Sequence, residues 1–359
     1  MLVVAIGLTG RTEAAPPDPV ALLRGVEASR AKIKSGRMEM TAVLVDLQSP
    51  KSAETRFLLR TTFNDVGRRM DQFSRALFID GATPAIAEAN GNKLRAMGKD
   101  REAFVRLGLG HWKETHVRSA HDGAQFMQYA EDLGARVKDP SEGSGDFIFD
   151  PRILGICGDY LMTHTVAGDL GYRGAKAISL VGSEEIDGHP TWRVRVVDKH
   201  EREDHFWIDE AADFAVRRHE NVNPYTKVAI ASHYDEDRGT TPGLPNWVEV
   251  REERSGRPFQ LLTLTVDKSE YNVPVDPGQW TLAGLGMPIG QMVIDERIHR
   301  SLGHFDGQKL TPSLPEAISN AREARWKPLH WGMAMTGLIV AAVLAAGFVH
   351  RRNLLRREA

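Results

Sequence analysis

Three histidines, His111, His116 and His121, recur every five residues and are the first candidates for metal binding. Imidazole is a common zinc ligand, but two ligands on one helix must share a face. Five residues turn an α-helix by about 500°, so successive imidazoles would point in different directions. No His-Glu-X-X-His motif accompanies them. We therefore expect surface or loop histidines and predict neither a metal nor another cofactor.

Two residues could act as nucleophiles in principle. Cys157, the single cysteine, lies in the apolar run 151–162, where a thiol is expected to be buried and inert. Ser144 lies between two glycines, and no Gly-X-Ser-X-Gly elbow exists in the chain, which favours a flexible loop. The sequence therefore predicts no catalytic residue and a protein that is not an enzyme.

Two further segments resemble ligand loops only superficially. The glycines of 284–290 have the wrong spacing for a dinucleotide loop, and no βαβ unit surrounds them. The acidic run 235–237 lacks the alternation and the glycine of a calcium-binding EF-hand loop. We expect a structural loop at the first and a solvated turn at the second.

The charge balance also limits the partners. The formal net charge is −2 at pH 7, and the body of the chain carries no long basic run. Nucleic-acid binding is therefore not expected. A single cysteine also excludes an internal disulfide, so an external domain would depend on core burial and sheet pairing.

Apolar residues on predicted strands are the remaining candidates for a binding site. They can simply form a core, or they can line a cavity for acyl chains, because flexible methionines and broad aromatic rings suit a ligand of variable length. Both roles are compatible in an open barrel. The candidates are Met38, Met40, Phe57, Leu59, Trp192, Val194 and Ile208.

The elements that would position these residues begin with one helix. Asp18 is a plausible N-cap, apolar residues follow at helical spacing, and Gly36 is expected to end the element. Strand patterns follow at 37–47, 54–64, 68–80 and 85–97, the last with a turn at 90–92. Between 100 and 170 the strand alternation is lost, and the apolar residues of Ala103 to Leu109 and of Phe126 to Leu133 suggest two helical pieces.

Strand patterns resume near Ala177. Asp187-Gly188 between two apolar runs predicts a tight hairpin, and further strands follow at 205–209, 215–221, 227–236, 247–253 and 260–272. Past Val273 the pattern is irregular. We predict an α+β fold that is mainly antiparallel, with about nine to eleven strands curled around the opening helix.

The most apolar segment is Trp331–Val349, which contains no charged residue. About 20 such residues cross a bilayer as a helix. We therefore predict a stalk at 306–328, a transmembrane helix at 329–350 and a basic tail at 351–359. Four arginines in the tail favour a cytoplasmic C-terminus. Small residues at four-residue spacing would allow close approach of a second helix, although an ordinary alanine-rich span explains them too: Gly337, Ala341 and Ala345.

Residues 1–15 resemble a signal peptide, with an apolar run and a small-residue end. The run is short and no cation precedes it, so a truncated signal and a disordered tail both remain open. Together the two ends predict a single-pass protein of the bacterial cell envelope, with an extracytoplasmic, periplasmic body.

Several motifs resemble one family. A helix leads through Lys-Ser-Gly (34–36) into a β meander, and Glu-Glu-Ile-Asp-Gly-His-Pro-Thr-Trp-Arg-Val (184–194) precedes Phe-Trp-Ile-Asp (206–209). The segments Phe-Asp-Pro-Arg-Ile-Leu-Gly (149–155) and 282–295 add to the pattern. Over roughly residues 19–298 the chain resembles the outer-membrane lipoprotein-sorting proteins, the LolA/LolB-like superfamily, and in particular its long bacterial relatives.

The resemblance implies an incomplete antiparallel barrel over 16–305, with a partly helical insertion near 100–170. In that family the cavity holds lipoprotein acyl chains or other lipids, and no catalytic residue is involved. It also implies a membrane-tethered binder of lipid or acylated lipoprotein. The family's carrier is soluble, whereas the apolar C-terminal segment here favours a stationary protein. The alternative is an envelope sensor or interaction module that signals through a partner membrane protein.

Overall fold

The computed structural model describes residues 15–48, 52–81, 83–97, 100–139, 149–157, 170–234 and 244–321. The chain forms two compact units, Met1–Val117 with Ser141–Val275 (unit 1) and Arg118–Pro140 with Asp276–Ala359 (unit 2). The predicted span, with Gly337, Ala341 and Ala345, lies outside the described residues, as does most of the signal-like segment. Within the described ranges, no helix has the length and apolarity needed to cross a bilayer.

Unit 1 opens with helix α1 (Pro19–Ala31). As predicted, Asp18 is its N-cap, because its carboxylate accepts a hydrogen bond from the Val20 N–H at 3.1 Å. One face of the helix is buried and carries Leu22, Leu23 and Val26. The predicted end at Gly36 is wrong by several residues, since Gly36 already belongs to strand β1.

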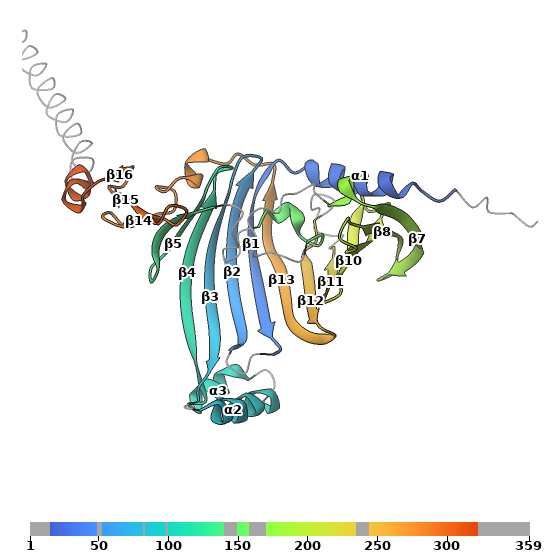
Figure 1. The fold of residues 1–359 in the computed structure, drawn as a ribbon, viewed down its shortest axis with the longest axis horizontal. Coiled ribbons are helices and arrows are strands. Elements are labelled where there is room, and N and C mark those ends of the chain that lie inside the picture. Colours follow the sequence, from blue (N-terminus) through green and yellow to red (C-terminus); the bar gives the residue numbers. More distant parts are fainter. Residues whose placement is uncertain are drawn as a thin grey trace, which may run out of the picture. The chain divides into compact units, whose positions relative to one another are not determined.

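The sheet of unit 1 is antiparallel throughout its described pairs. Its order is β3-β2-β1-β13-β12-β11-β10-β9-β8-β7, and Figure 1 shows it as a set of long, curved strands. The bounds are β1 (Ser35–Asp46), β2 (Ser52–Asn64), β3 (Arg68–Ile79), β7 (Ala177–Ile186), β8 (His189–Val197), β9 (Glu203–Asp209), β10 (Ala215–Val222), β11 (Thr226–His233), β12 (Trp247–Arg254) and β13 (Arg257–Tyr271).

The predicted hairpin is present between β7 and β8. Asp187 and Gly188 both have positive φ, 51° and 83°. This is the backbone that a two-residue turn of the type I′ kind requires. The mainly antiparallel fold class and the opening helix are thus confirmed for unit 1.

Residues 85–97, expected to be a strand, form helix α2 (Pro84–Ala96) instead. Its buried positions, Ala87, Asn90, Gly91 and Leu94, recur at helical spacing. The segment also lacks the β-branched residues that favour strands. The predicted turn at 90–92 therefore lies inside a helix. A short helix α3 (Arg101–Arg106) follows, as the pattern there indicated.

Strand β4 (Gly110–His121) begins in the sequence range of unit 1 and ends in that of unit 2. The expected helical piece near Phe126–Leu133 is wrong, because β5 (Phe126–Ala130) and β6 (Gly134–Lys138) form a hairpin there. All five residues of β5 are buried. Burial on both faces removes the alternation by which a strand is recognised in sequence.

Unit 2 continues with β14 (Met292–Asp295), β15 (Arg300–Phe305) and β16 (Leu310–Thr311). Strand β14 pairs with β6 in parallel, while β15 pairs with β14 and β16 in antiparallel fashion. The described residues hold sixteen strands, so the predicted nine to eleven was too low. Part of the predicted stalk is also folded, since β16 lies within it and Ala317 is fully buried.

Short 3₁₀ turns complete the described elements: η1 (Pro151–Ile153), η2 (Tyr172–Gly174) and η4 (Pro277–Trp280). The core of unit 2 is a compact apolar cluster that includes Met127, Val137, Leu285 and Phe305.

Candidate functional site

The predicted ligand-contacting residues share one face of the unit 1 sheet. Directly opposed residues of an antiparallel pair project to the same face. A row of such pairs runs across seven strands, Leu44–Leu262–Val250–Ile230–His219–Phe206–Val194. We call this surface the inner face.

The candidates form two groups on the inner face. On β1 and β2, Met38, Met40, Phe57 and Leu59 lie together, with Met40 opposite Leu59. On β8 and β9, Trp192 lies opposite Ile208, and Val194 lies two residues along from Trp192. The following are buried: Met38, Met40, Leu59, Val194 and Ile208. Phe57 and Trp192 are half-buried. That these seven residues contact a lipid remains a prediction.

A nine-residue segment, 149–157, packs against the inner face, and we call it the plug. Gly155 has a φ of 77°, and a Cβ there would lie 2.4 Å from Ser232 Oγ of β11. The Leu154 carbonyl accepts a hydrogen bond from Arg30 of α1 at 3.0 Å. The plug thus contacts both the sheet and α1, and Figure 1 shows its short helical turn in green near α1 and β13.

Arg152 connects the plug to the β2–β3 turn. Its guanidinium pairs with Asp150 at 2.7 Å and with Asp65 at 2.7 Å. It also donates to the Ile33 carbonyl at 3.3 Å and lies 5.7 Å from the centre of the Phe63 ring. Burial alone would lower the pKa of Arg152, but the hydrogen bonds to the two carboxylates outweigh it and raise that pKa.

Asp150 also compensates the charge of a second buried arginine, Arg68. Burial lowers the pKa of Arg68, which lies at the start of β3, while the charge of Asp150 opposes that shift. Asp150 itself is 3 % exposed and caps η1 through the Arg152 N–H at 3.0 Å. One carboxylate therefore compensates two arginines, and the contacts hold the plug in place rather than activate a reacting group.

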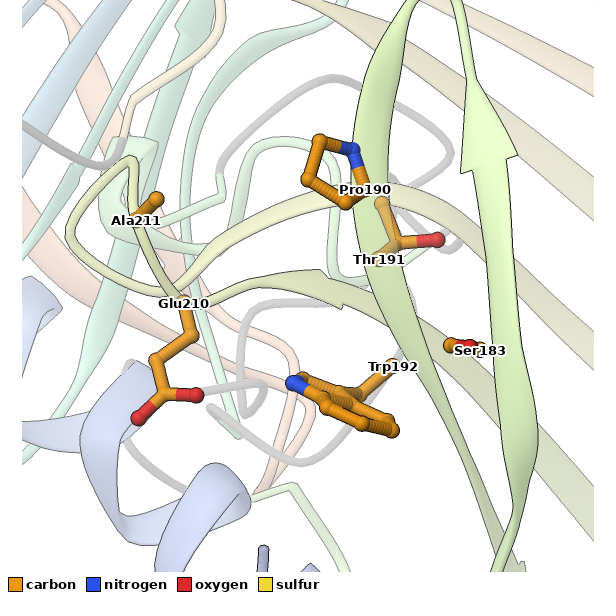
Figure 2. A pocket seen from close by; sticks show the side chains of 6 residues that line it. All are labelled: Ser183, Pro190, Thr191, Trp192, Glu210 and Ala211. Atoms are coloured by element: carbon orange, nitrogen blue, oxygen red, sulfur yellow. The ribbon is translucent and has the colours of Figure 1, made fainter. Parts of the chain in front are cut away.

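A pocket of about 410 Å³ opens where the β7–β8 hairpin meets the β9–β10 turn. In Figure 2 the carboxylate of Glu210 points toward the indole of Trp192 across it. Helix α1 passes beside the same turn, because a Cβ on Gly25 would lie 2.3 Å from the Phe214 ring. The lining residues are Ser183, Pro190, Thr191, Trp192, Glu210 and Ala211.

The turn that carries Glu210 is fixed by a buried ion pair. Arg217 Nε donates to Asp209 at 2.8 Å, and the two side chains are 5 % and 2 % exposed. His189 Nδ1 lies 3.4 Å from the same carboxylate. Beside them, the Tyr234 hydroxyl donates to the Val216 carbonyl at 2.9 Å, and burial raises the pKa of Tyr234. These groups position the pocket wall.

Sequence reasoning identified only Trp192 among the pocket residues. The pocket arises because a turn packs against a hairpin some twenty residues earlier in the chain. Small residues such as Pro190 and Ala211 carry no periodic signal of that contact. The Gly-His-Pro-Thr-Trp motif was the only available signal, and it had indicated a hairpin rather than a pocket.

The three spaced histidines lie on β4 and have separate contacts. His111 Nδ1 lies 2.7 Å from an Asp80 oxygen, His116 stacks on Phe73 at 3.9 Å between ring centres, and His121 accepts from the Gly123 N–H at 3.1 Å. In the part of the chain that the structure describes, no three His, Cys, Asp or Glu side chains are grouped to hold a metal ion.

The remaining candidates for chemistry are the cysteine, the glycine-rich loop, the serine and the acidic run. Cys157 ends the plug and is half-buried, whereas full burial was expected. Gly284 packs against η4, since a Cβ there would lie 2.4 Å from the Gly278 carbonyl oxygen. Segment 284–290 is thus a packed loop. Ser144 and the acidic run 235–237 lie outside the described residues.

No protein-family model matches the chain, and no curated protein matches it in sequence. Among solved structures, a domain described as an outer-membrane lipoprotein-sorting protein from Vibrio parahaemolyticus shares 11 % identity at a TM-score of 0.42, covering 75 % of this chain and 100 % of its own. A DUF1329 family protein from Desulfovibrio piger shares 12 % identity at a TM-score of 0.42, covering 75 % of this chain and 100 % of its own.

A LolA superfamily protein from Nitrosomonas europaea shares 9 % identity at a TM-score of 0.39, covering 74 % of this chain and 98 % of its own. The first and third of these structures are described by the family name that the sequence motifs resemble.

Proposed function

We propose that the chain binds a lipid, or the acyl chain of a lipoprotein, on the inner face of unit 1 and that it does so without catalysis while tethered to a membrane. One observation carries the proposal. The apolar inner face extends from β1 to β8, and in the described structure a nine-residue segment with no strand pairing of its own packs against it.

The plug can leave the face only in exchange for a long apolar ligand. Its polar contacts are ion pairs and single hydrogen bonds, through Arg152 and Leu154, and water can replace these at about 1 kcal/mol each. Its side chains Phe149, Ile153 and Leu154 are fully buried, and exposing each of them costs about 1.5–3 kcal/mol. An acyl chain that takes the vacated surface gains about 0.8 kcal/mol per buried CH₂. A chain of about a dozen methylenes, as in a lipid, is therefore needed to offset the loss of the plug.

The pocket beside Trp192 is a site at which a ligand can first bind. Its volume of about 410 Å³ falls within the range of small-molecule sites. Trp192 belongs both to the pocket lining and to the inner face, opposite Ile208. A ligand entering here would thus reach the apolar row of strands directly.

The single cysteine allows a direct test on the full-length protein. The protein is purified in detergent, bound lipid is extracted for mass spectrometry, and the labelling rate of Cys157 by a maleimide is measured with and without a fatty-acid probe. We expect co-purified lipid and a faster rate with the probe, because the plug that carries Cys157 is displaced. No bound lipid, together with a rate insensitive to the probe, would refute the proposal.

A second candidate, a protein-interaction module, is favoured by one observation. Strand β7 ends the sheet order and exposes Val181 to 50 %. An open strand edge can pair with a segment of another chain. A photo-crosslinker at Val181 that captured one specific membrane protein in cells would support this function, and capture of none would count against it.

A further inference from the structure

Unit 2 exposes an unusual share of large apolar side chains. Of the fifteen that are exposed among the described residues, seven lie between 276 and 321. We call them the hairpin surface. They are Ile289, Met292, Ile294, Ile298, Leu302, Leu314 and Ile318.

The β14–β15 hairpin organises this surface. Along β14, Val293 faces the core of unit 2 and is fully buried, whereas Met292 and Ile294 face the opposite way. Leu302 lies at the bulge where the pairing of β15 with β14 shifts, and Ile298 lies in the connecting turn. The core face is already packed, so the exposed set is not needed for the core of this unit.

Two neighbours extend the surface beyond the hairpin. A Cβ on Gly290 would lie 2.8 Å from Leu314 Cδ1, and a Cβ on Gly307 would lie 3.8 Å from Ile289 Cγ1. Because the Gly290 N–H donates to the Phe305 carbonyl at 2.7 Å, these contacts place Leu314 and Ile289 around the open end of the hairpin.

Cations accompany the apolar residues. Arg297 and Arg300 flank the connecting turn, and Arg297 pairs with Asp295 at 2.6 Å. Arg300 is exposed. Arginines beside exposed aliphatic side chains are typical of surfaces that enter the headgroup region of a bilayer, where the stems lie in apolar surroundings and the charges stay hydrated.

The course of the chain after this surface points to a bilayer as its partner. The chain is helical at 314–321, which includes Leu314 and Ile318. Within ten residues of that helix the sequence reaches the uncharged stretch Trp331–Val349, after Arg322, Arg325, Trp326 and Lys327. A helix end so close to the predicted membrane-spanning segment would hold unit 2 at a high effective concentration near the bilayer surface.

We propose that the hairpin surface of unit 2 rests in the headgroup region of the bilayer that holds the C-terminal segment. Ile298 and Leu302 then lie about 5–10 Å into the boundary between headgroups and acyl chains, as for other interfacial elements. This proposal rests on the membrane tether of the proposed function but not on a ligand in unit 1. Membrane contact by unit 2 and lipid binding by unit 1 can therefore fail independently.

The test uses the full chain in phosphatidylcholine–phosphatidylglycerol vesicles. On a Cys157→Ala background, Ile298→Cys and Leu302→Cys each carry an environment-sensitive fluorophore. Leu107→Cys is the matched control, because Leu107 is an aliphatic residue of unit 1 exposed to 66 %. Lipids with a nitroxide near the headgroup or deep in the acyl chain serve as quenchers.

We expect blue-shifted emission at positions 298 and 302, with a larger loss of fluorescence to the shallow nitroxide than to the deep one, and no loss at position 107. Two results would overturn the proposal. In the first, the emission is blue-shifted but neither nitroxide quenches it, and the blue shift persists in detergent; another segment of this chain then covers the surface. In the second, neither nitroxide quenches the emission, and the blue shift is lost when the protein is diluted within the vesicles; a second copy of the chain then covers the surface.

Discussion

At the scale of single residues, Arg152 holds the charge balance of the plug. Its side chain is 13 % exposed and that of Asp150 is 4 % exposed. Replacing Arg152 by methionine keeps most of the volume but removes the main partner of a buried carboxylate. Breaking such a pair destabilises proteins by about 3–5 kcal/mol, and the remaining cation Arg68 is expected to keep the loss near the lower end of that range.

Chemical denaturation at pH 7 measures this loss. Arg251→Met is the matched control, because Arg251 forms an ion pair with Glu249 but is 70 % exposed, and exposed pairs contribute little. Adding Asp150→Asn to Arg152→Met should lower the stability further, because buried Arg68 then loses the carboxylate charge that compensates it. Equal effects of the Arg152 and Arg251 variants would mean that the plug is not held by charge.

Glu54 is expected to make the stability of the protein depend on pH. It is 8 % exposed and accepts from Arg56 at 2.6 Å and from Arg101 of α3 at 3.1 Å. Burial would raise the pKa of Glu54, but the two hydrogen bonds outweigh it and lower that pKa below the usual 4.5. A carboxylate whose pKa is lower in the folded state than in the unfolded state stabilises the fold at pH values above its unfolded-state pKa. This stability is lost as the pH falls through the folded-state pKa.

Unfolding free energies of the wild type and of Glu54→Gln, measured from pH 7 down to pH 3, test this sign. We expect the wild type to be the more stable at pH 7 and the two curves to converge below the ordinary glutamate range. Parallel curves would show that the contacts of Glu54 with α3 do not depend on its charge.

At the scale of elements, the plug depends on one glycine. Gly155 combines a φ of 77° with a close approach to Ser232, so alanine is strained there for two reasons. We expect Gly155→Ala to lower stability by at least about 1 kcal/mol and to speed maleimide labelling of Cys157. Gly174→Ala is the control, since a Cβ there meets no atom within 4 Å and its φ is not positive. Identical labelling rates in the two variants would contradict this account of the plug.

Elements fixed by local chemistry were predictable from the sequence. Asp18 capped α1 and Asp187-Gly188 turned the β7–β8 hairpin as expected, because each signal lies within a few residues. Helix α2 was missed because its alternating small residues imitate a strand. Strand β5 was missed because burial on both faces removes its period, and the parallel pair β14–β6 joins residues about 160 positions apart, where sequence patterns carry no signal.

The same distinction applies to the site. The inner-face residues Met40, Leu59, Val194 and Ile208 were identified from strand alternation alone, and the structure places them on one continuous face. The plug was visible only as an apolar run, because its contacts with Arg30, Asp65 and Ser232 bring together distant parts of the chain. Periodicity therefore predicts which side chains face inward, whereas what covers them depends on tertiary packing.

At the scale of the whole molecule, the proposed function requires unit 1 to lie outside the cytoplasm while the basic tail lies inside. A membrane-impermeant maleimide can test this on intact spheroplasts with a Cys157→Ala background. Tyr225→Cys reports on unit 1, because Tyr225 is 76 % exposed, and Ala359→Cys reports on the tail. We expect Tyr225→Cys to be labelled in intact spheroplasts and Ala359→Cys only after detergent is added, since the excess of arginine after Val349 favours retention of the tail in the cytoplasm. The reverse pattern would place the inner face in the cytoplasm and rule out a role in the envelope, whereas labelling of both positions without detergent would rule out a single span between them.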